Sequence, residues 1–404
     1  MATNYRQIHA RLISVIALLF AGAYLVSAQP SEVEFRRILR EKANFSESDF
    51  AELDRGTSVI KLLAVNEKRE IGVCGVMLLK NAGEITMAAF RESVSPRNNR
   101  SMLDGGDISK PPVVDDLKSL ELDKRDLEDM RKCSVGDCGL KLSAAMITRL
   151  QTAVDWDSAE SKARATEWFR REVFDYILDY SRRGNQALMT FNDKKTPTRL
   201  ADEHRQLLDE ALFINDFAPE FAKHLGNYPA FVLPGVDDSL TWSKITFGFK
   251  PTITVAHVSA YTHNDRGTPQ YLMATKQIYG SHYLDSSLAL SMLVNVSANG
   301  SLNTYLTFTN LSRSDSLTGP LGGVKRSLIG TEATQHVKDI LKFAKVRLES
   351  TPAERQVSEI GPTDINLLGV IVDELGNPIV QAALLIVIGA ILFAGFYIFR
   401  RLRS

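Results

Sequence analysis

Residues 288–311 read LALSMLVNVSANGSLNTYLTFTNL. Apolar side chains occupy every second position over 288–296, which is the period of a strand with one buried face. The Ala-Asn-Gly sequence at 298–300 is typical of a hairpin turn, and 304–311 read as the returning strand. The stretch therefore predicts two antiparallel neighbours in a sheet.

The same alternation precedes this hairpin, and a helical pattern follows it. Apolar and polar residues alternate over 245–249 and, after a proline, over 253–261. A turn at 264–267 leads to another strand at 271–279. Beyond the hairpin, apolar residues at helical spacing run from about 321 to 349. This order predicts an antiparallel sheet followed by one long amphipathic helix.

The N-terminal half adds two strands and many helices. Residues 58–65 and 70–79 look like strands, and the second leads through an Asn-Ala-Gly turn into a short helix at 84–90. Residues 31–54 look helical, and most of 112–235 carries helical patterns. Strands in one group and helices in another predict an α+β fold.

Both ends of the chain carry apolar stretches. Residues 379–399 are uncharged over roughly the ~20 residues that cross a bilayer, and arginines follow at once. A buried core helix is the alternative interpretation. Residues 1–28 combine a basic start, an apolar run and a small-x-small site, which is typical of a cleaved signal peptide; an uncleaved anchor is the alternative.

These two ends together predict a location. We expect a single-pass protein of the cell membrane, anchored through Ile379–Phe399. Its N-terminal domain would be exported to the periplasm or the extracellular space. The stub at 400–404 would be cytoplasmic and too short to form a domain.

Composition and cysteines limit the possible chemistry. The 404-residue chain has 48 Lys plus Arg and 48 Asp plus Glu, so its charge gives no reason to expect a nucleic-acid partner. Cys133 and Cys138 are spaced for a local disulfide, with glycines that permit a tight turn. Half of a metal site is the alternative, but no nearby Cys or His would complete it. Cys74 lies in an apolar strand and is expected to be a buried thiol.

Two segments carry a family resemblance. IGVCGV at 71–76 is followed by NAGEI at 81–85, and LSRSDSL at 311–317 is followed by GPLGG at 319–323. The first pair looks like the opening strand and helix, and the second like the last strand end and closing helix, of the START-like (SRPBCC-type, helix-grip) superfamily. The resemblance covers about 58–91 and 238–349 only.

The resemblance implies a curved antiparallel sheet gripping a long C-terminal helix, with an apolar tunnel for a lipid or other hydrophobic molecule. The expected fold is thus α+β with a helix-grip sheet, a large helical insertion and one C-terminal transmembrane helix. The expected domains are a signal peptide (1–28), an N-terminal helical segment (29–57), a START-like domain (58–349) with an insertion at 112–235, a linker (350–378), a transmembrane helix (379–399) and a tail (400–404).

The same resemblance points to residues that would line or border the tunnel. The expected ligand-binding residues are Phe247, Phe249, His257, Tyr261, His282, Met292, Arg313 and Ile340. A triad of Ser281, His282 and Asp285 is disfavoured, because triad members converge from different elements and the chain has no Gly-x-Ser-x-Gly elbow. We assign no catalytic residue, no metal and no cofactor.

Three classes of function follow from these observations. The leading hypothesis is a membrane-anchored exported domain that binds a lipid or other hydrophobic small molecule. The alternative is a structural or protein-interaction ectodomain with a packed core and no ligand, and an enzyme is the third. The sequence names no protein partner.

Overall fold

The computed structural model describes residues 31–80, 85–95, 102–246, 250–265, 268–298, 300–319 and 322–349. The predicted signal peptide, linker, membrane helix and tail lie outside these residues, and so do Phe247 and Phe249.

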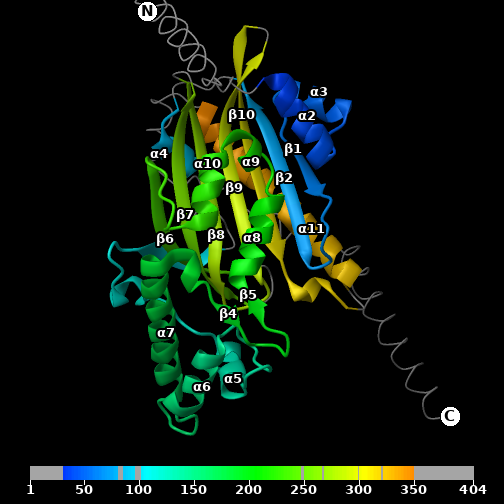
Figure 1. The fold of residues 1–404 in the computed structure, drawn as a ribbon. Helices are drawn as coiled ribbons and strands as arrows, with labels where there is room; N and C mark the ends of the chain where they lie inside the picture. The colour runs from blue at the N-terminus through cyan, green and yellow to red at the C-terminus, as the bar shows by residue number, and fades with distance from the viewer. Residues whose placement is uncertain are drawn as a thin grey trace, which may run out of the picture. The chain divides into compact units, whose positions relative to one another are not determined.

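Among the described residues, eight strands form one antiparallel sheet in the order β1-β2-β10-β9-β8-β7-β6-β3 (Figure 1). The strands are β1 (Val59–Leu63), β2 (Glu70–Leu79), β3 (Met102–Ile108), β6 (Val236–Ile245), β7 (Thr252–Asp265), β8 (Thr268–Gly280), β9 (Ser286–Ala298) and β10 (Ser301–Arg313). A separate two-stranded hairpin joins β4 (Thr190–Phe191) and β5 (Thr198–Arg199). The hairpin of β9 and β10 pairs from Ser301 with Ala298 to Arg313 with Ser286, and it confirms the antiparallel sheet.

One side of the sheet, the α11 face, is covered by the long helix α11 (Gly322–Glu349) and the short helix α4 (Met87–Ser93). Apolar side chains on this face are Val73, Met77, Leu79, Val258, Tyr271, Met273, Leu293, Leu306 and Phe308. They pack with Val337, Leu341 and Ala344 of α11, which lie on one side of that helix. The predicted long C-terminal helix and the α+β class are therefore confirmed.

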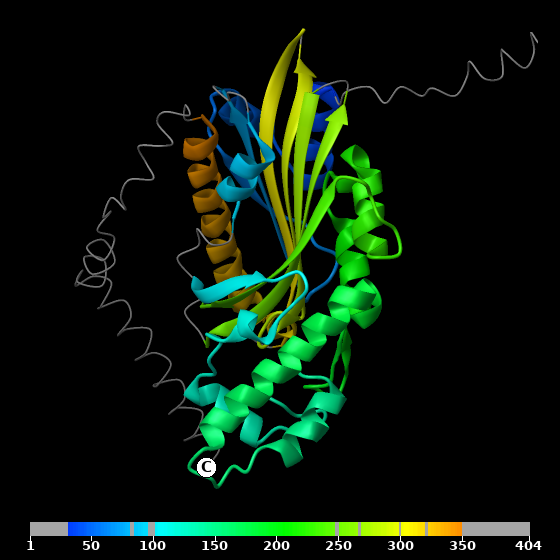
Figure 2. The same cartoon turned by 90° about the vertical axis from the view of Figure 1, so that its left-hand side faces the viewer.

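The opposite side, the α8 face, is covered by helices from two parts of the chain (Figure 2). They are α2 (Glu32–Ala43), α3 (Glu47–Asp54), α7 (Ser161–Arg183), α8 (Leu200–Glu210), α9 (Ile214–Phe217) and α10 (Pro219–Asn227). The helices α5 (Lys124–Arg131) and α6 (Ala144–Ala153) lie beyond the end of the sheet, beside α7 (Figure 1). Short 3-10 turns lie at η2 (Val114–Leu117), η3 (Gly184–Ala187) and η4 (Asp315–Leu317). Most of these helices come from 112–235, the predicted insertion.

Because helices cover both faces of the sheet, the alternation of apolar residues along a strand does not mark one face as exposed. The alternation at 288–296 predicts one buried face, yet every residue of β2 is buried and most of β9 is too. Leu290 and Met292 pack on the α8 face, while Ser291 and Leu293, at the alternate positions, lie on the α11 face. The strictly apolar side of β9 therefore faces the layer of α2 and α8, and not the C-terminal helix.

Local sequence signals account for several element boundaries. Ser46 caps α3 in a capping box: its backbone amide donates to Asp49 Oδ2 at 2.7 Å, and its hydroxyl accepts from the Asp49 amide at 3.3 Å. The structure joins Cys133 and Cys138 in a disulfide with Cα atoms 4.3 Å apart, as their spacing predicts. Gly136 takes a φ of +86° inside this small ring, a conformation that favours glycine.

The predicted membrane helix needs a correction. Within the described ranges, no helix is both long enough and apolar enough to cross a membrane. The helices α7 and α11 have 23 and 28 residues, but charged side chains occur along each of them. The finding contradicts the single-pass architecture and the membrane location expected from sequence, and the segment that was expected to span, 379–399, lies outside the described residues.

We expect that the close approach of α11 to β2 requires Gly75. A Cβ atom at this position would lie 2.5 Å from Val337 Cγ1 and 2.8 Å from Leu341 Cδ1. Gly75→Ala should therefore lower the free energy of unfolding by about 1–3 kcal/mol, measured by urea titration. Gly323→Ala is the matched control, because nothing lies within 4 Å of its added Cβ; equal effects of the two changes would contradict this prediction.

Candidate functional site

The expected ligand-binding residues are distributed over both sides of the sheet. His257, Met292 and Arg313 lie on the α8 face, where they are buried, and Tyr261 packs half-buried at the same face. His282 is buried in the loop between β8 and β9. Among the expected ligand-binding residues that the structure describes, Ile340 of α11 lies at the α11 face, where it is half-buried. These residues therefore do not meet in one cavity.

A row of side chains crosses the α11 face between β10 and β7. Asn310 pairs with Ala289, Ala289 with Thr275, and Thr275 with Val258, so all four point to the same side. Val258 is buried, but the other three side chains are half-exposed, and so is Ala256 next to them on β7. This row of side chains is therefore only partly covered by the rest of the described structure.

One flank of α11 faces this open part of the sheet. Lys345 donates to the Gly56 carbonyl at 2.7 Å, which fixes one flank toward the β1 edge. Arg347, about 160° further round the helix, pairs with Glu92 of α4, and α4 packs against β8. Ile329, Ala333, His336 and Ile340 share the flank of Arg347 at helical spacing, and all four are half-buried.

We name this region the helix–sheet groove. Its described walls are Ala256, Thr275, Ala289 and Asn310 on the sheet, and Ile329, Ala333, His336 and Ile340 on α11. Both walls keep partial solvent exposure, although each is built on a regular element.

The groove changes in polarity along the strands. Toward α4, the floor is apolar and buried, with Phe308, Met273 and Leu293. Toward η4, hydroxyl and amide groups follow: Ser287 Oγ lies 2.9 Å from Ser312 Oγ, and Asn310 Nδ2 donates to Ser287 Oγ at 3.1 Å. The groove is therefore apolar at the end near α4 and polar at the end near η4.

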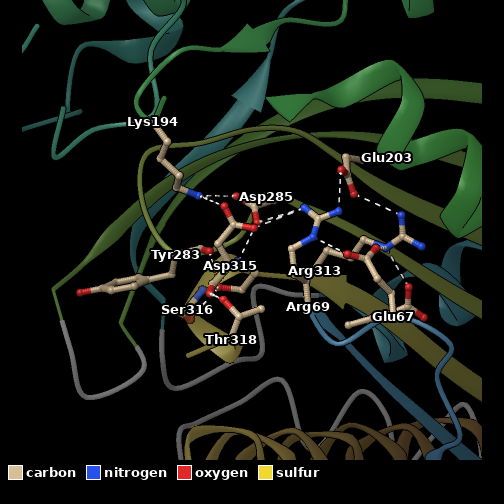
Figure 3. A network of polar contacts seen from close by, with 12 residues as sticks. Glu67, Arg69, Lys194, Glu203, Tyr283, Asp285, Arg313, Asp315, Ser316 and Thr318 are labelled. Atoms are coloured by element: carbon tan, nitrogen blue, oxygen red, sulfur yellow. Dashed lines mark hydrogen bonds and ion pairs between the residues drawn. The ribbon is translucent and has the colours of Figure 1, made fainter. Parts of the chain in front are cut away.

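A charged network occupies the α8 face at the end of β10 (Figure 3). The Arg313 side chain is 1% exposed; its Nε donates to Glu70 at 2.8 Å and its guanidinium to Glu203 of α8 at 3.1 Å. Burial acts to lower the pKa of Arg313, but its hydrogen bonds to Glu70 and Glu203 outweigh this and raise it. Burial raises the pKa of Glu70 to about 7 against the lowering effect of Arg313, with Glu210 adding to the rise.

Asp285 joins this network to neighbouring segments. Its carboxylate is fully buried and accepts from Lys194 beside the β4–β5 hairpin at 3.3 Å and from the backbone amide of Asp315 in η4 at 2.8 Å. Lys141 reaches the same carboxylate at 2.5 Å. Arg69 connects Asp315 to Glu203, so β10, η4 and α8 share one set of ion pairs (Figure 3). Each charged side chain of this network has a partner of opposite charge, so we assign the network a structural role.

A second polar cluster lies under α7 and α10. The Asp238 carboxylate accepts from Ser259 Oγ at 2.6 Å and faces His257 Nε2 at 3.0 Å and His224 Nε2 at 3.1 Å. Tyr180 OH lies 2.9 Å from His257 Nδ1. Ser259 Oγ also lies 3.4 Å from His257 Nε2, but it donates to Asp238 at the shorter distance of 2.6 Å, whereas the serine of a hydrolase triad passes its proton to the histidine. Burial lowers the pKa of His257 to about 4.

The geometry around His282 gives no triad either. His282 Nε2 lies 2.8 Å from Asp126 Oδ1, and its Nδ1 lies 2.9 Å from the Gly139 carbonyl. Ser281 Oγ accepts from the Ile253 amide at 2.9 Å, while Asp285 binds the lysines described above. Each group is held by a different partner, so His282 links the sheet to α5. The sequence carried no signal for these partners, because Asp126 is far from His282 along the chain.

Comparison with known proteins gives little further guidance. No protein-family model matches this chain, and no curated protein matches it. Among solved structures, the crystal structure of human STARD10 matches 83% of this chain and 86% of its own length, with 8% sequence identity and a TM-score of 0.32. At this identity and TM-score the match does not establish a family, and the START-like resemblance stays a prediction.

We expect Arg313 to be essential for stability. Arg313→Met would leave the buried carboxylate of Glu70 without its cation and Glu203 with Arg69 alone, so the free energy of unfolding should fall by about 3–5 kcal/mol. Arg37→Met removes a guanidinium that pairs with Glu34 and Glu41 on the exposed side of α2, and it should cost less than about 1 kcal/mol. Urea titration of both variants tests this, and a small loss for Arg313→Met would show that the network is dispensable.

The stability of the fold should fall in acid because of His257. Its pKa of about 4 in the fold lies below the ordinary 6.5, so the unfolded chain binds more protons between these values. Stability is complete above pH 6.5, and up to about 3 kcal/mol is lost as the pH falls to 4. His257→Gln should lose less over this window, whereas His263→Gln, half-exposed on the same strand, should follow the wild type. Identical pH dependences for all three proteins would contradict the assignment.

Proposed function

We propose that the helix–sheet groove binds a hydrophobic or amphiphilic small molecule such as a lipid. The observation that carries the proposal is the half-exposure of both facing walls, Thr275 and Ala289 on the sheet and Ala333 and Ile340 on α11. Side chains between a sheet and its covering helix are normally buried, so partial exposure there indicates space that a ligand can fill.

The side chains around this space favour an apolar ligand segment. Ala289 and Ala333 are small, and Phe308 and Val258 form buried apolar floor next to the open row. Each methylene group that moves from water onto such a surface contributes about 0.8 kcal/mol. A chain of several methylene groups would therefore supply enough free energy for micromolar binding.

The resemblance to the START-like superfamily supports the same interpretation, because the ligand of that superfamily is expected between the sheet and the closing helix. The charged clusters of the α8 face offer a weaker candidate site. Their charges are paired with one another, and the Ser259 hydroxyl donates to Asp238 at 2.6 Å, a shorter distance than its 3.4 Å to His257. A packed interaction domain without a ligand is the outcome to be distinguished by experiment.

The test uses laurdan, an uncharged fluorophore with an acyl tail, whose emission shifts in apolar surroundings. Wild-type chain should bind it saturably. Ala333→Trp fills the groove from the α11 side and should weaken binding by at least about tenfold, or about 1.4 kcal/mol.

The control variant changes the same helix outside the groove. Leu328 is 61% exposed on the far side of α11, so Leu328→Trp should leave the affinity within about twofold of the wild type. Native mass spectrometry of the chain with added monooleoylglycerol gives a second readout. Absence of saturable binding by the wild type, or equal effects of the two tryptophans, would overturn the proposal.

A further inference from the structure

Helix α11 begins at the polar end of the helix–sheet groove. Arg326, near the start of the helix, donates to the backbone carbonyls of Lys68 and Glu70 at the start of β2. Glu70 pairs with Arg313 of β10, and Ser312 is the adjacent residue on that strand. The first turns of α11 therefore lie at the level of Ser312 along the strands, where the floor of the groove is polar.

A cation lies on the groove flank of α11 at this end. Lys325 precedes Ile329 by one helical turn, so the two residues share that flank. Lys325 is exposed, and among the described residues no acidic side chain pairs with it. The first acidic residue of α11 is Glu332, about 10 Å further along the helix axis. The ammonium group of Lys325 is therefore free to pair with a ligand.

The neighbouring arginine adds to the positive charge. The bonds of Arg326 go to two backbone carbonyls, which are uncharged acceptors, and in the part of the chain that the structure describes no carboxylate pairs with its guanidinium. Lys325 and Arg326 thus give this end of the groove a positive charge that the fold itself does not compensate. Such a charge attracts an anionic head group and repels a cationic one.

The polar floor of the groove adds a hydrogen-bond donor. Ser312 Oγ donates to Asn310 Oδ1 at 2.7 Å, and Asn310 Nδ2 donates to Ser287 Oγ at 3.1 Å. Because the Ser312 proton is used in this way, Ser287 is the donor in its 2.9 Å contact with Ser312 Oγ. The three groups form a closed ring that uses both hydroxyl protons and one amide proton. The second N–H of Asn310, a half-exposed residue, is left to donate to a ligand oxygen.

We infer that the groove takes an amphiphile with an anionic head group, a carboxylate or a phosphate, which binds between Lys325 and Asn310. This inference rests on the proposed function, because it specifies the ligand of the same groove. The flexible four-carbon stem of Lys325 brings the ammonium to an anionic oxygen, Asn310 Nδ2 donates to that head group, and the chain lies against Ala289 and Ala333. Both polar groups are partly exposed, so the anion stays partly hydrated and avoids the cost of a buried ion.

The test measures how amphiphiles below their critical micelle concentrations displace laurdan from the full chain. Dodecanoate, dodecyl phosphate and dodecanol carry a carboxylate, a phosphate and an uncharged hydroxyl group. Lys325→Gln should weaken the binding of dodecanoate, dodecyl phosphate or both about threefold to fivefold, the range of an exposed ion pair, and leave dodecanol binding within about 1.5-fold. Added salt should reduce the difference between the wild type and Lys325→Gln for the anions.

Two further variants separate the head-group contact from general effects of charge. Lys338 is an exposed lysine on the same helix, but it shares the flank of Lys345, which bonds to the Gly56 carbonyl near β1. Lys338→Gln should therefore leave the binding of all three amphiphiles within about 1.5-fold. Asn310→Asp keeps the size of the side chain but replaces its free donor by a negative charge. It should weaken anion binding at least about tenfold and dodecanol binding less than about threefold.

The outcomes keep the two proposals apart. If laurdan does not bind saturably to the wild type, the proposed function itself fails. If laurdan binds but Lys325→Gln weakens the anions and dodecanol equally, or if Lys338→Gln weakens the anions as much as Lys325→Gln does, only the head-group inference is overturned. If the loss is confined to the anions and to Lys325→Gln and Asn310→Asp, the inference holds, and the tighter of the two anions identifies the head group.

Discussion

The alternation of side chains along β7 to β10 is the constraint on which the rest of this structure depends. Each strand must satisfy two layers of helices at once, and a slip of one residue would move His257 and Lys276 onto the α11 face. Uncharged side chains beneath α11 and charged ones beneath α7 and α8 fix the register from both sides. The register of the sheet is therefore set by two requirements: apolar side chains are buried on both faces, and the charged side chains of β7 to β10 lie on the α8 face only.

The charges of the α8 face explain how helices from 112–235 attach to the sheet. Glu203 of α8 reaches Arg313, His224 of α10 reaches Asp238, and Tyr180 of α7 reaches His257. Apolar packing alone would allow such helices to slide, whereas a buried ion pair or hydrogen bond is satisfied in one position only. Desolvation offsets much of the attraction in these pairs, so their main contribution is to positioning.

The periodicity of the sequence was sufficient for the sheet, the closing helix and the α+β class, because alternation and helical spacing are local properties. It was not sufficient for the site. Met292 belongs to the more apolar side of β9, and that side faces α2 and α8. The sequence of the helical segment at 112–235 does not indicate which face of the sheet these helices will cover. The partners of Arg313 and His282 were equally hidden, since Glu203 and Asp126 lie far away along the chain.

The separation of charge between the two faces also affects how each face should respond to salt and to pH. Screening by salt acts on charged groups, and the described polar residues on the groove side of β7 to β10 are hydroxyls and amides. Protonation of His257 in acid would weaken the contacts of α7 with the sheet on the other side, where Tyr180 bonds to its ring. The fold itself should therefore depend on pH through His257, which lies on the face of the sheet opposite the helix–sheet groove.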